Sequence, residues 1–142
     1  MFAKNASNLK NRVIPAQIVK NNKDPRHIVR VKTLKAIFAW EFTKNPPLDH
    51  DATQIVRSIK KIDKLIRINA PKWPLDKINK VDLSVLRLAC WELFHKKKTP
   101  TKVIIDEAIE LAKRYSGKSS SSFVNGVLGS LIGKIRQPND KK

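Results

Sequence analysis

The sequence has few of the residues that build disulfides, metal sites and phosphate-binding loops. It contains one cysteine, Cys90, which excludes an internal disulfide and a zinc site made of several cysteines. Its three histidines, His27, His50 and His95, are too far apart for an HxxxH or HExxH metal motif. The four glycines form no P-loop motif. We therefore expect no metal and no cofactor.

Long apolar stretches are also missing. No segment approaches the length of a transmembrane helix, and the first residues lack the continuous apolar block of a secretory signal. Cys90 lies in the apolar run Leu86–Leu93, where a small buried hydrophobe is a more common role than a nucleophile. A reducing compartment fits a lone thiol, so we expect a cytoplasmic protein.

Acidic residues are scarce. The 142 residues include 12 Asp and Glu against 30 Lys and Arg, which leaves a formal net charge of +18. Such a balance does not bear on the fold, but it favours polyanionic partners, with nucleic acid first and an anionic membrane surface second. The plain alternative is a basic host proteome, or charge kept only for solubility.

The apolar residues that are present recur at intervals of three and four, which predicts helices. These run from about 26 to 45, 55 to 66, 82 to 95, 102 to 115 and 123 to 132, with a short turn at 75–78. Prolines separate most of them. Nothing alternates with a period of two, as a strand would. The expected fold is all-α, a compact bundle of about five long helices and one short one.

Particular residues should start, stop or fill these helices. The apolar stripe of the first helix is predicted to be Val31, Leu34, Phe38 and Phe42, widened by Ile37 and Trp40. Asp49 or Asp51 can cap the second helix. The nearly all-round apolar helix at 82–95 is predicted to be central. Gly117 should end the helix at 102–115, and one of the serines at 119–122 should cap the last helix.

The predicted helix at 55–66 has a narrow apolar stripe, because its isoleucines step by four, three and four. The opposite face carries Arg57, Lys60, Lys61, Lys64 and Arg67. Asp63 is the only acid in that interval. Such a face is usually just solvated. Five unrelieved like charges repel one another, however, so a role in attracting RNA is an equal alternative.

No catalytic constellation is evident. Asp106 and Glu110 are i,i+4 neighbours, with Glu107 beside them. An acidic patch of this kind could hold a cation, but more often it balances the helix dipole and pairs with Lys102 or Arg114. A nucleophile, a base and an orienting group do not occur together, so we expect a protein that is not an enzyme.

Three strings carry a family resemblance. KVDLSVLRLACWEL occupies residues 80–93, VIIDEAIELAKRYS occupies 103–116 and FVNGVL occupies 123–128. In order, spacing and content they resemble the C-terminal half of the NusB family of bacterial transcription antitermination factors. RHIVRVKTLKAIFAW, at 26–40, is similar to that family's Arg-rich first helix. The resemblance therefore covers about residues 26–132.

The resemblance implies two packed helical sub-bundles and no catalytic activity. It implies that the chain binds the single-stranded boxA element of nascent RNA together with a small ribosomal-subunit protein, which acts as the factor NusE. That complex joins the transcription elongation complex and suppresses termination, notably on ribosomal RNA operons. No membrane role is implied, and both a monomer and a homodimer remain open.

Matched position by position, the resemblance also assigns functional residues. The RNA-binding residues are Arg26, His27, Arg30, Phe38, Lys118, Ser119 and Phe123. Asp82, at the start of the central helix, falls at an acidic position of the partner interface. Cations suit phosphates and aromatics suit stacked bases. Core packing is an equal alternative for Phe38 and Phe123, and we expect Arg26 and Arg30 to be exposed at the helix start.

The sequence departs from the family pattern in several places. The first helix has fewer arginines, and the link from Trp40 to Ile55 is short, which predicts that a helix often found there is missing. Gly129 and Ser119 stand where acids are common. A flexible basic extension at 1–25 is expected before the domain at 26–135, with an organellar transit peptide as the alternative for its acid-free first 23 residues, and a polar tail at 136–142 is expected after it.

Two other functions fit the same sequence. One is a NusB-like RNA-binding or protein-interaction module that acts in ribosomal RNA processing or modification. The other is a protein-interaction scaffold whose charge is incidental. RNA affinity that depends on phosphate contacts falls steeply with salt, which separates the scaffold from the RNA binders.

Overall fold

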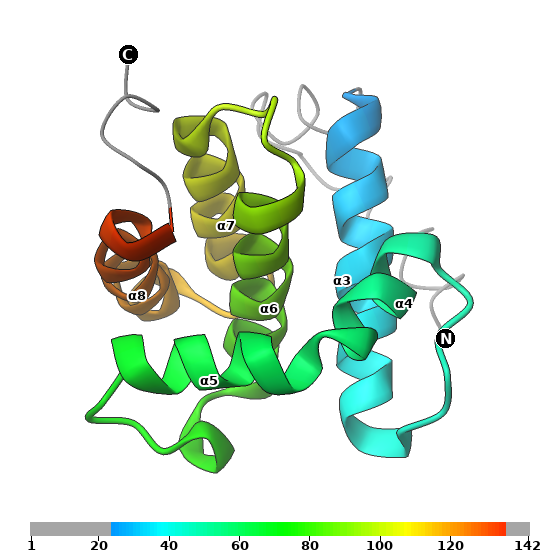
Figure 1. Ribbon diagram of the computed structural model, residues 1–142, viewed down its shortest axis with the longest axis horizontal. Helices are drawn as coiled ribbons and strands as arrows, with labels where there is room; N and C mark the ends of the chain where they lie inside the picture. The colour runs from blue at the N-terminus through cyan, green and yellow to red at the C-terminus, as the bar shows by residue number, and fades with distance from the viewer. Residues whose placement is uncertain (1–23, 136–142) are drawn as a thin grey trace, which may run out of the picture. The chain divides into compact units, whose positions relative to one another are not determined.

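The computed structural model describes residues 24–135, and every regular element in that range is a helix (Figure 1). In chain order these elements are α3 (Pro25–Thr43), α4 (His50–Arg57), α5 (Ile59–Asn69), the 3-10 helix η1 (Leu75–Lys77), α6 (Lys80–His95), α7 (Thr101–Tyr115) and α8 (Lys118–Ile135). The predicted all-α bundle is confirmed. The predicted extension lies outside the described residues except for Asp24 and Pro25, and the predicted tail lies outside them entirely.

The chain forms two compact units, Met1–Arg30 and Val31–Lys142. In the first unit, Asp24 caps α3, because its Oδ1 accepts the backbone N–H of Arg26 at 2.9 Å. Pro25 occupies the first helical position, where its missing N–H costs nothing. The predicted helix start after Asp24-Pro25 is confirmed.

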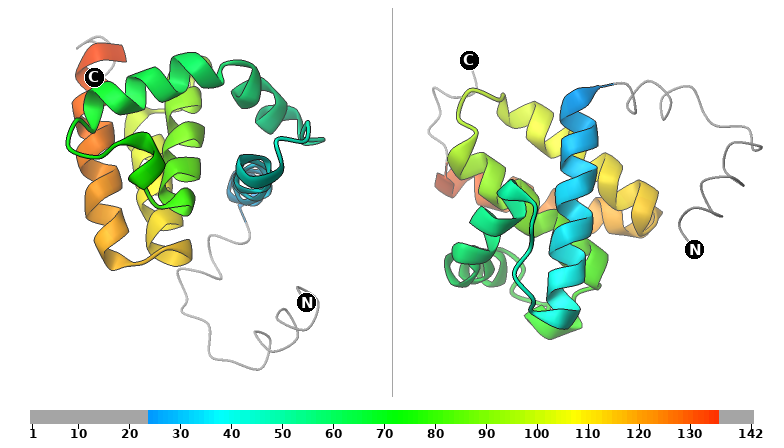
Figure 2. Two further views of the ribbon diagram at one scale, coloured as in Figure 1. Left: turned by 90° about the horizontal axis from the view of Figure 1, so that it is seen from below. Right: turned by 90° about the vertical axis from the view of Figure 1, so that its right-hand side faces the viewer.

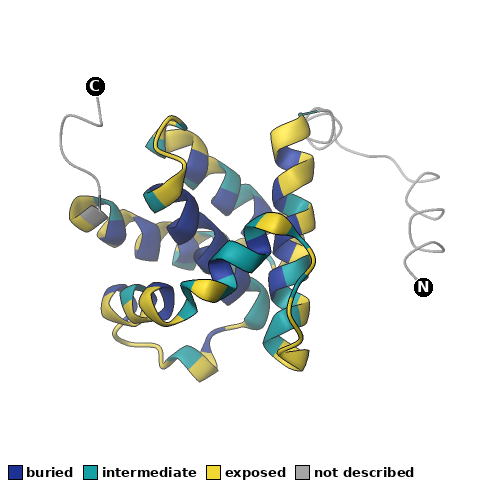
Figure 3. Ribbon diagram, turned by 45° about the vertical axis from the view of Figure 1, so that its right-hand side comes forward, coloured by how far each residue is buried: buried dark blue, intermediate teal, exposed yellow. Residues whose placement is uncertain are grey.

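The second unit is built around α6. Every residue of α6 from Asp82 to Leu93 is buried, and α4, α5, α7 and α8 all pack against this helix. Within the second unit, α7 and α8 lie on one side of α6, and α4 and the Val31–Thr43 part of α3 lie on the other (Figures 1 and 2). Buried positions gather where these helices face one another (Figure 3). The prediction of a central helix is confirmed, and burial of its apolar surface is the main source of stability.

The predicted helix across 55–66 is in fact two helices. The backbone N–H of Ser58 donates to the carbonyl oxygens of Gln54 and Ile55, and its φ of −103° and ψ of 16° end α4 before α5 begins. Ile55, Ile62 and Ile66 are buried on both sides of the break. The apolar period therefore continues through the break and does not reveal it.

The link between α3 and α5 does contain a helix, so the prediction of a missing helix is wrong. The helix is α4, and its cap is Asp49, one of the two residues predicted for that role. Asp49 Oδ2 accepts the N–H of Ala52 at 3.0 Å and the hydroxyl of Thr33 at 2.8 Å. A single side chain thus starts α4 and fixes it to α3, which lets a short link hold a helix.

The buried face of α3 differs from the predicted stripe. Thr33, Leu34 and Ile37 are buried, whereas Phe38 is half-buried and Phe42 is 63% exposed. Thr33 occupies an inner position because its hydroxyl has a partner there in Asp49. The prediction that Phe42 belongs to the inner stripe is therefore wrong.

The junction between α7 and α8 is also tighter than predicted. Gly117 ends α7 as expected, with a φ of +151° that disfavours residues with a side chain. Its N–H donates to the carbonyl oxygen of Ala112 at 3.0 Å. α8 begins at the next residue, so the serines at 119–122 lie inside its first turns and do not cap it, contrary to the prediction.

A buried ion-pair network joins α3, α5 and α6 in the second unit. Arg87 is 3% exposed and donates from Nε and Nη2 to the two carboxylate oxygens of Asp63, both at 2.9 Å, and from Nη1 to Glu41 at 2.6 Å. Burial raises the pKa of Glu41, but the hydrogen bond and charge of Arg87, with Lys44 and Lys80 nearby, outweigh it and lower that pKa. Burial likewise lowers the pKa of Arg87, and its two carboxylate partners raise it above the ordinary value.

Cys90 lies inside α6 and is 0% exposed. Its burial, with the negative charge of Asp63 as a second cause, raises the pKa of the thiol to about 12. A thiol of this kind is neither accessible nor ionised near neutral pH. The predicted role as a small buried hydrophobe is confirmed.

Replacing Arg87 should test how much the ion-pair network contributes to the free energy of unfolding. Arg87→Met should lower the free energy of unfolding by about 3–5 kcal/mol, because it leaves the Asp63 carboxylate buried without its cation. Lys102→Met is the matched control, since Lys102 pairs with Asp106 on the surface with 84% and 59% of the two side chains exposed. That change should cost less than about 1 kcal/mol. Urea denaturation gives both values, and equal losses in the two variants would contradict a dominant role for the buried pair.

Thiol labelling should test the burial of Cys90. In native buffer the thiol should react with an aromatic disulfide reagent only as fast as the protein unfolds, because the reactive thiolate is both shielded and suppressed. The labelling rate should rise with added urea in parallel with unfolding followed by circular dichroism. Complete labelling within seconds in native buffer would place Cys90 at the surface.

Candidate functional site

The start of α6 and the start of α8 lie beside each other and are joined by a hydrogen bond, and a second contact links the end of α7 to α8. Ser120 Oγ donates to Asp82 Oδ2 at 2.9 Å, and Ser116 Oγ lies 2.8 Å from Ser120 Oγ. We name the residues at 116–123 together with Asp82 the α6–α8 corner. Four of the predicted site residues belong to this corner, namely Asp82, Lys118, Ser119 and Phe123. Lys118 and Ser119 are exposed at its tip.

Asp82 lies inside the corner, with 5% of its surface exposed. Its Oδ2 accepts the hydroxyl of Ser120, and its Oδ1 is buried without a hydrogen-bond partner among the described residues. Burying a carboxylate oxygen without a hydrogen-bond partner costs folding free energy. Asp82 therefore offers little surface of its own and acts on the surface by holding the start of α8.

Phe123 combines both of the roles that the sequence left open. It is half-buried and packs against the core. Its ring also contacts Trp73 edge to face, with the ring centroids 6.3 Å apart and the planes at 79°. Trp73 is 54% exposed. Trp73 was not among the predicted site residues. The sequence feature that could have indicated it is an aromatic residue between two prolines in a lysine-containing stretch.

The predicted RNA-binding residues of the first unit differ in accessibility. Arg26 is exposed, and its Nε lies 3.5 Å from Oδ1 of Asp24 in a surface ion pair. His27 is 3% exposed and Arg30 is 9% exposed. The expectation of an exposed Arg30 is therefore wrong. Spacing along a helix gives the angle between residues but does not say which face is covered.

Phe38 and Phe123 belong to two separate aromatic pairs. Phe38 contacts Phe42 edge to face, with ring centroids 5.0 Å apart. The Val31–Thr43 part of α3, which carries both, lies across α6 from α8 (Figures 1 and 2). The structure therefore does not bring Phe38 to the α6–α8 corner.

The basic face predicted for residues 55–67 is present. Arg57, Lys60, Lys61, Lys64 and Arg67 are all exposed. In residues 24–135 none of these five forms an ion pair. Asp63, the one acid of this segment, turns inward to Arg87. The exposed charged groups of α5, with Arg57 of α4, are therefore all cationic.

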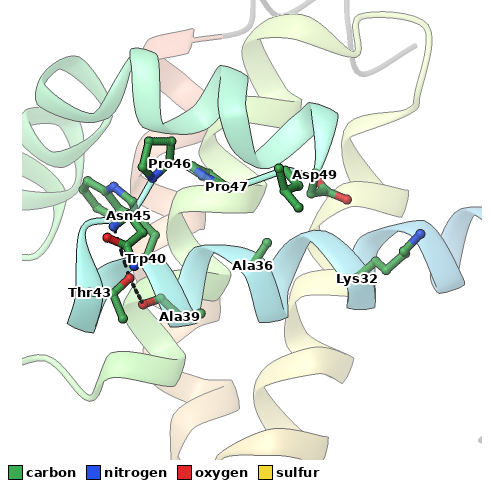
Figure 4. Close-up of a pocket in the computed structure, with 10 residues that line it drawn as sticks. Lys32, Ala36, Ala39, Trp40, Thr43, Asn45, Pro46, Pro47 and Asp49 are labelled. Atoms are coloured by element: carbon green, nitrogen blue, oxygen red, sulfur yellow. Dashed lines mark hydrogen bonds between the residues drawn. The ribbon is translucent and has the colours of Figure 1, made fainter.

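A groove of about 500 Å³ lies between α3 and the link that leads to α4 (Figure 4). It is lined by Lys32, Ala36, Ala39, Trp40, Thr43 and residues 45–49. Lys32 and Asp49 are its charged groups, and Asp49 is already hydrogen-bonded to Thr33 and to the backbone of Ala52. The lining does not pair a nucleophile with a base, so the groove gives no support to an enzymatic site.

Within the described residues no three His, Cys, Asp or Glu side chains gather where they could hold a metal ion. Across the same residues, no helix has the length and apolar character needed to cross a membrane. The chemistry that the structure does present at its surface is cationic and aromatic.

Comparison with known proteins gives the family. The model of the NusB family matches residues 51–132. A protein of Thermotoga sp. (strain RQ2), named transcription antitermination protein NusB, is 39% identical over an alignment of 139 residues that covers 84% of this chain and 97% of the relative. A protein of the same name from Clostridium botulinum (strain Kyoto / Type A2) is 51% identical over 71 residues, half of each chain.

A solved structure agrees with the sequence relatives. The structure of T. maritima NusB superposes with a TM-score of 0.72 at 37% identity, and covers 84% of this chain and 97% of its own. Members of the family act in transcription antitermination and catalyse no reaction. The fold, the three matching strings and these relatives together show that the chain belongs to the NusB family of transcription antitermination proteins.

Proposed function

We propose that this transcription antitermination factor binds single-stranded, boxA-like RNA together with a small ribosomal-subunit protein, NusE. The joint complex enters the cytoplasmic transcription elongation complex and suppresses termination, notably on ribosomal RNA operons. The observation that carries the proposal is the α6–α8 corner, where the first turns of one helix carry an exposed cation, an exposed hydroxyl and a ring.

The corner has the groups that single-stranded RNA requires. Lys118 supplies a cation for phosphate, Ser119 supplies a hydroxyl for sugar or phosphate, and Phe123 supplies an aromatic ring. In the first unit, Arg26 is exposed and suited to a further phosphate contact. His27 and Arg30 are buried and so offer RNA little surface.

The cationic face of α5 supports the same proposal at longer range. Four of its residues and Arg57 are exposed and unrelieved by acids within the described chain. A face of this kind raises the local concentration of a polyanion and speeds its approach without selecting a sequence. We therefore propose that the cationic face of α5 attracts the RNA and that the α6–α8 corner contacts it.

Asp82 serves the partner interface indirectly. Because it is buried and bonded to Ser120, it sets the position of the first turn of α8, where the exposed residues of the corner stand. A partner protein that docks on this turn then meets a surface already in place, which reduces the entropy lost on binding.

A salt series with matched lysine variants should test the RNA contact. Lys118→Ala should weaken binding of a boxA-type oligoribonucleotide and reduce the slope of log K against log salt by about 0.7, the loss of about one phosphate contact on a single strand. Lys97→Ala is the control, because Lys97 is an equally exposed lysine in the link between α6 and α7. It should leave the slope unchanged within error. Equal changes in both variants would mean that only total charge matters.

Serine variants in α8 should test the partner interface. Ser120→Ala removes the hydrogen bond to Asp82 and should weaken binding of the small ribosomal-subunit protein at least about fivefold, the size of one lost hydrogen bond near 1 kcal/mol. Ser122→Ala changes an exposed serine in the same helix and should bind as the wild type does. Calorimetry with the purified partner gives both constants. Identical constants would separate the corner from the partner interface.

A further inference from the structure

Trp73 is the most exposed of the three tryptophans. It is 54% exposed, whereas Trp91 is 5% exposed and Trp40 is half-buried beside Arg87 and Lys44. Phe123, its one ring neighbour among the described residues, meets it at 79° and can cover only one side of the indole. The rest of this large flat apolar ring faces water and is open to a ligand.

The backbone holds Trp73 in place before any ligand arrives. Its N–H donates to the carbonyl oxygen of Ala70 at 3.1 Å, which closes a turn with Pro71 at its second position. Pro74 follows and starts the next turn, where its carbonyl oxygen accepts the N–H of Lys77 at 2.8 Å. Ile78 then anchors the segment in the core at 4% exposure. A backbone segment fixed in this way loses little entropy on binding.

The charges around the ring favour an anionic ligand. Lys72 and Lys77 are exposed on the same short segment, against one exposed acid, Asp76. Lys118 stands at the start of α8, the helix that carries Phe123. Aromatic faces flanked by lysines are what an unpaired nucleotide needs, a ring for its base and cations for its phosphates.

We propose that Trp73 and Phe123 together form a stacking platform for an unpaired base of the bound RNA. Trp73 is then an RNA-binding residue in addition to those predicted from the sequence. The proposal rests on the RNA binding proposed above and extends it from the α6–α8 corner to the segment that precedes α6. A protein surface that docks on Trp73 is the competing occupant, and the experiment below separates the two.

The test measures the affinity of a single-stranded boxA-type oligoribonucleotide for the full chain and for Trp73 variants. Trp73→Leu should weaken binding about tenfold at every salt concentration, because it removes the stacking ring but no cation. The slope of log K against log salt should stay unchanged, in contrast to Lys118→Ala. Trp73→Phe should restore most of the affinity. Addition of RNA to the wild type should quench tryptophan fluorescence, and Trp73→Phe should lose that quenching.

Leu48→Ala is the control for loss of exposed apolar surface, since Leu48 is 102% exposed in the link before α4, and it should bind RNA as the wild type does. Wild-type protein that fails to bind the RNA would overturn the proposed function and the platform together. RNA binding that is equal in the wild type and Trp73→Leu, without quenching, would overturn the platform alone. A Trp73→Leu defect confined to binding of the ribosomal-subunit protein would also overturn it and assign the ring to a protein contact.

Discussion

The packing of the second unit depends on the ion pairs of one buried cation, Arg87. Arg87 lies in the middle of the central helix, where a guanidinium is costly unless its donors are filled. Two carboxylates from α3 and α5 fill them, at 2.9 Å for Asp63 and 2.6 Å for Glu41. The geometry is specific, because the planar guanidinium donates its N–H groups to carboxylates in its own plane. Both helices are thereby fixed in rotation against α6.

The same ion pair shapes the surface on the far side of α5. Asp63 is the single acid of its helix, and the pairing with Arg87 turns it inward. The exposed charged residues of α5 are therefore lysines and arginine only. A structural demand of the core thus produces a cationic surface suited to a polyanion, and the charge of that surface is a consequence of the fold as much as of the composition.

The candidate site was predictable in part. Lys118, Ser119 and Phe123 could be located because they stand within or beside strings that follow the family pattern, and the structure does bring them to one corner with Asp82. Trp73 could not be located, because its contact with Phe123 joins positions 50 residues apart that share no local pattern. The burial of His27 and Arg30 could not be predicted either, because helical spacing gives the angles between residues but not which face of the helix is covered.

The sequence by itself determined the helices, their order, the family and the excess of positive charge. Apolar spacing, prolines and Gly117 act over a few residues, so they can be interpreted without a partner segment. The tertiary structure alone decided the break at Ser58, the inward turn of Asp63 and the rotation of α3 that leaves Phe42 outside. The last two depend on a hydrogen bond or a packed surface supplied by a distant segment, and the hydrogen bonds of Ser58 to its own helix show only in the folded backbone. The free energy of burying a side chain is a property of its surroundings, and those exist only after the chain has folded.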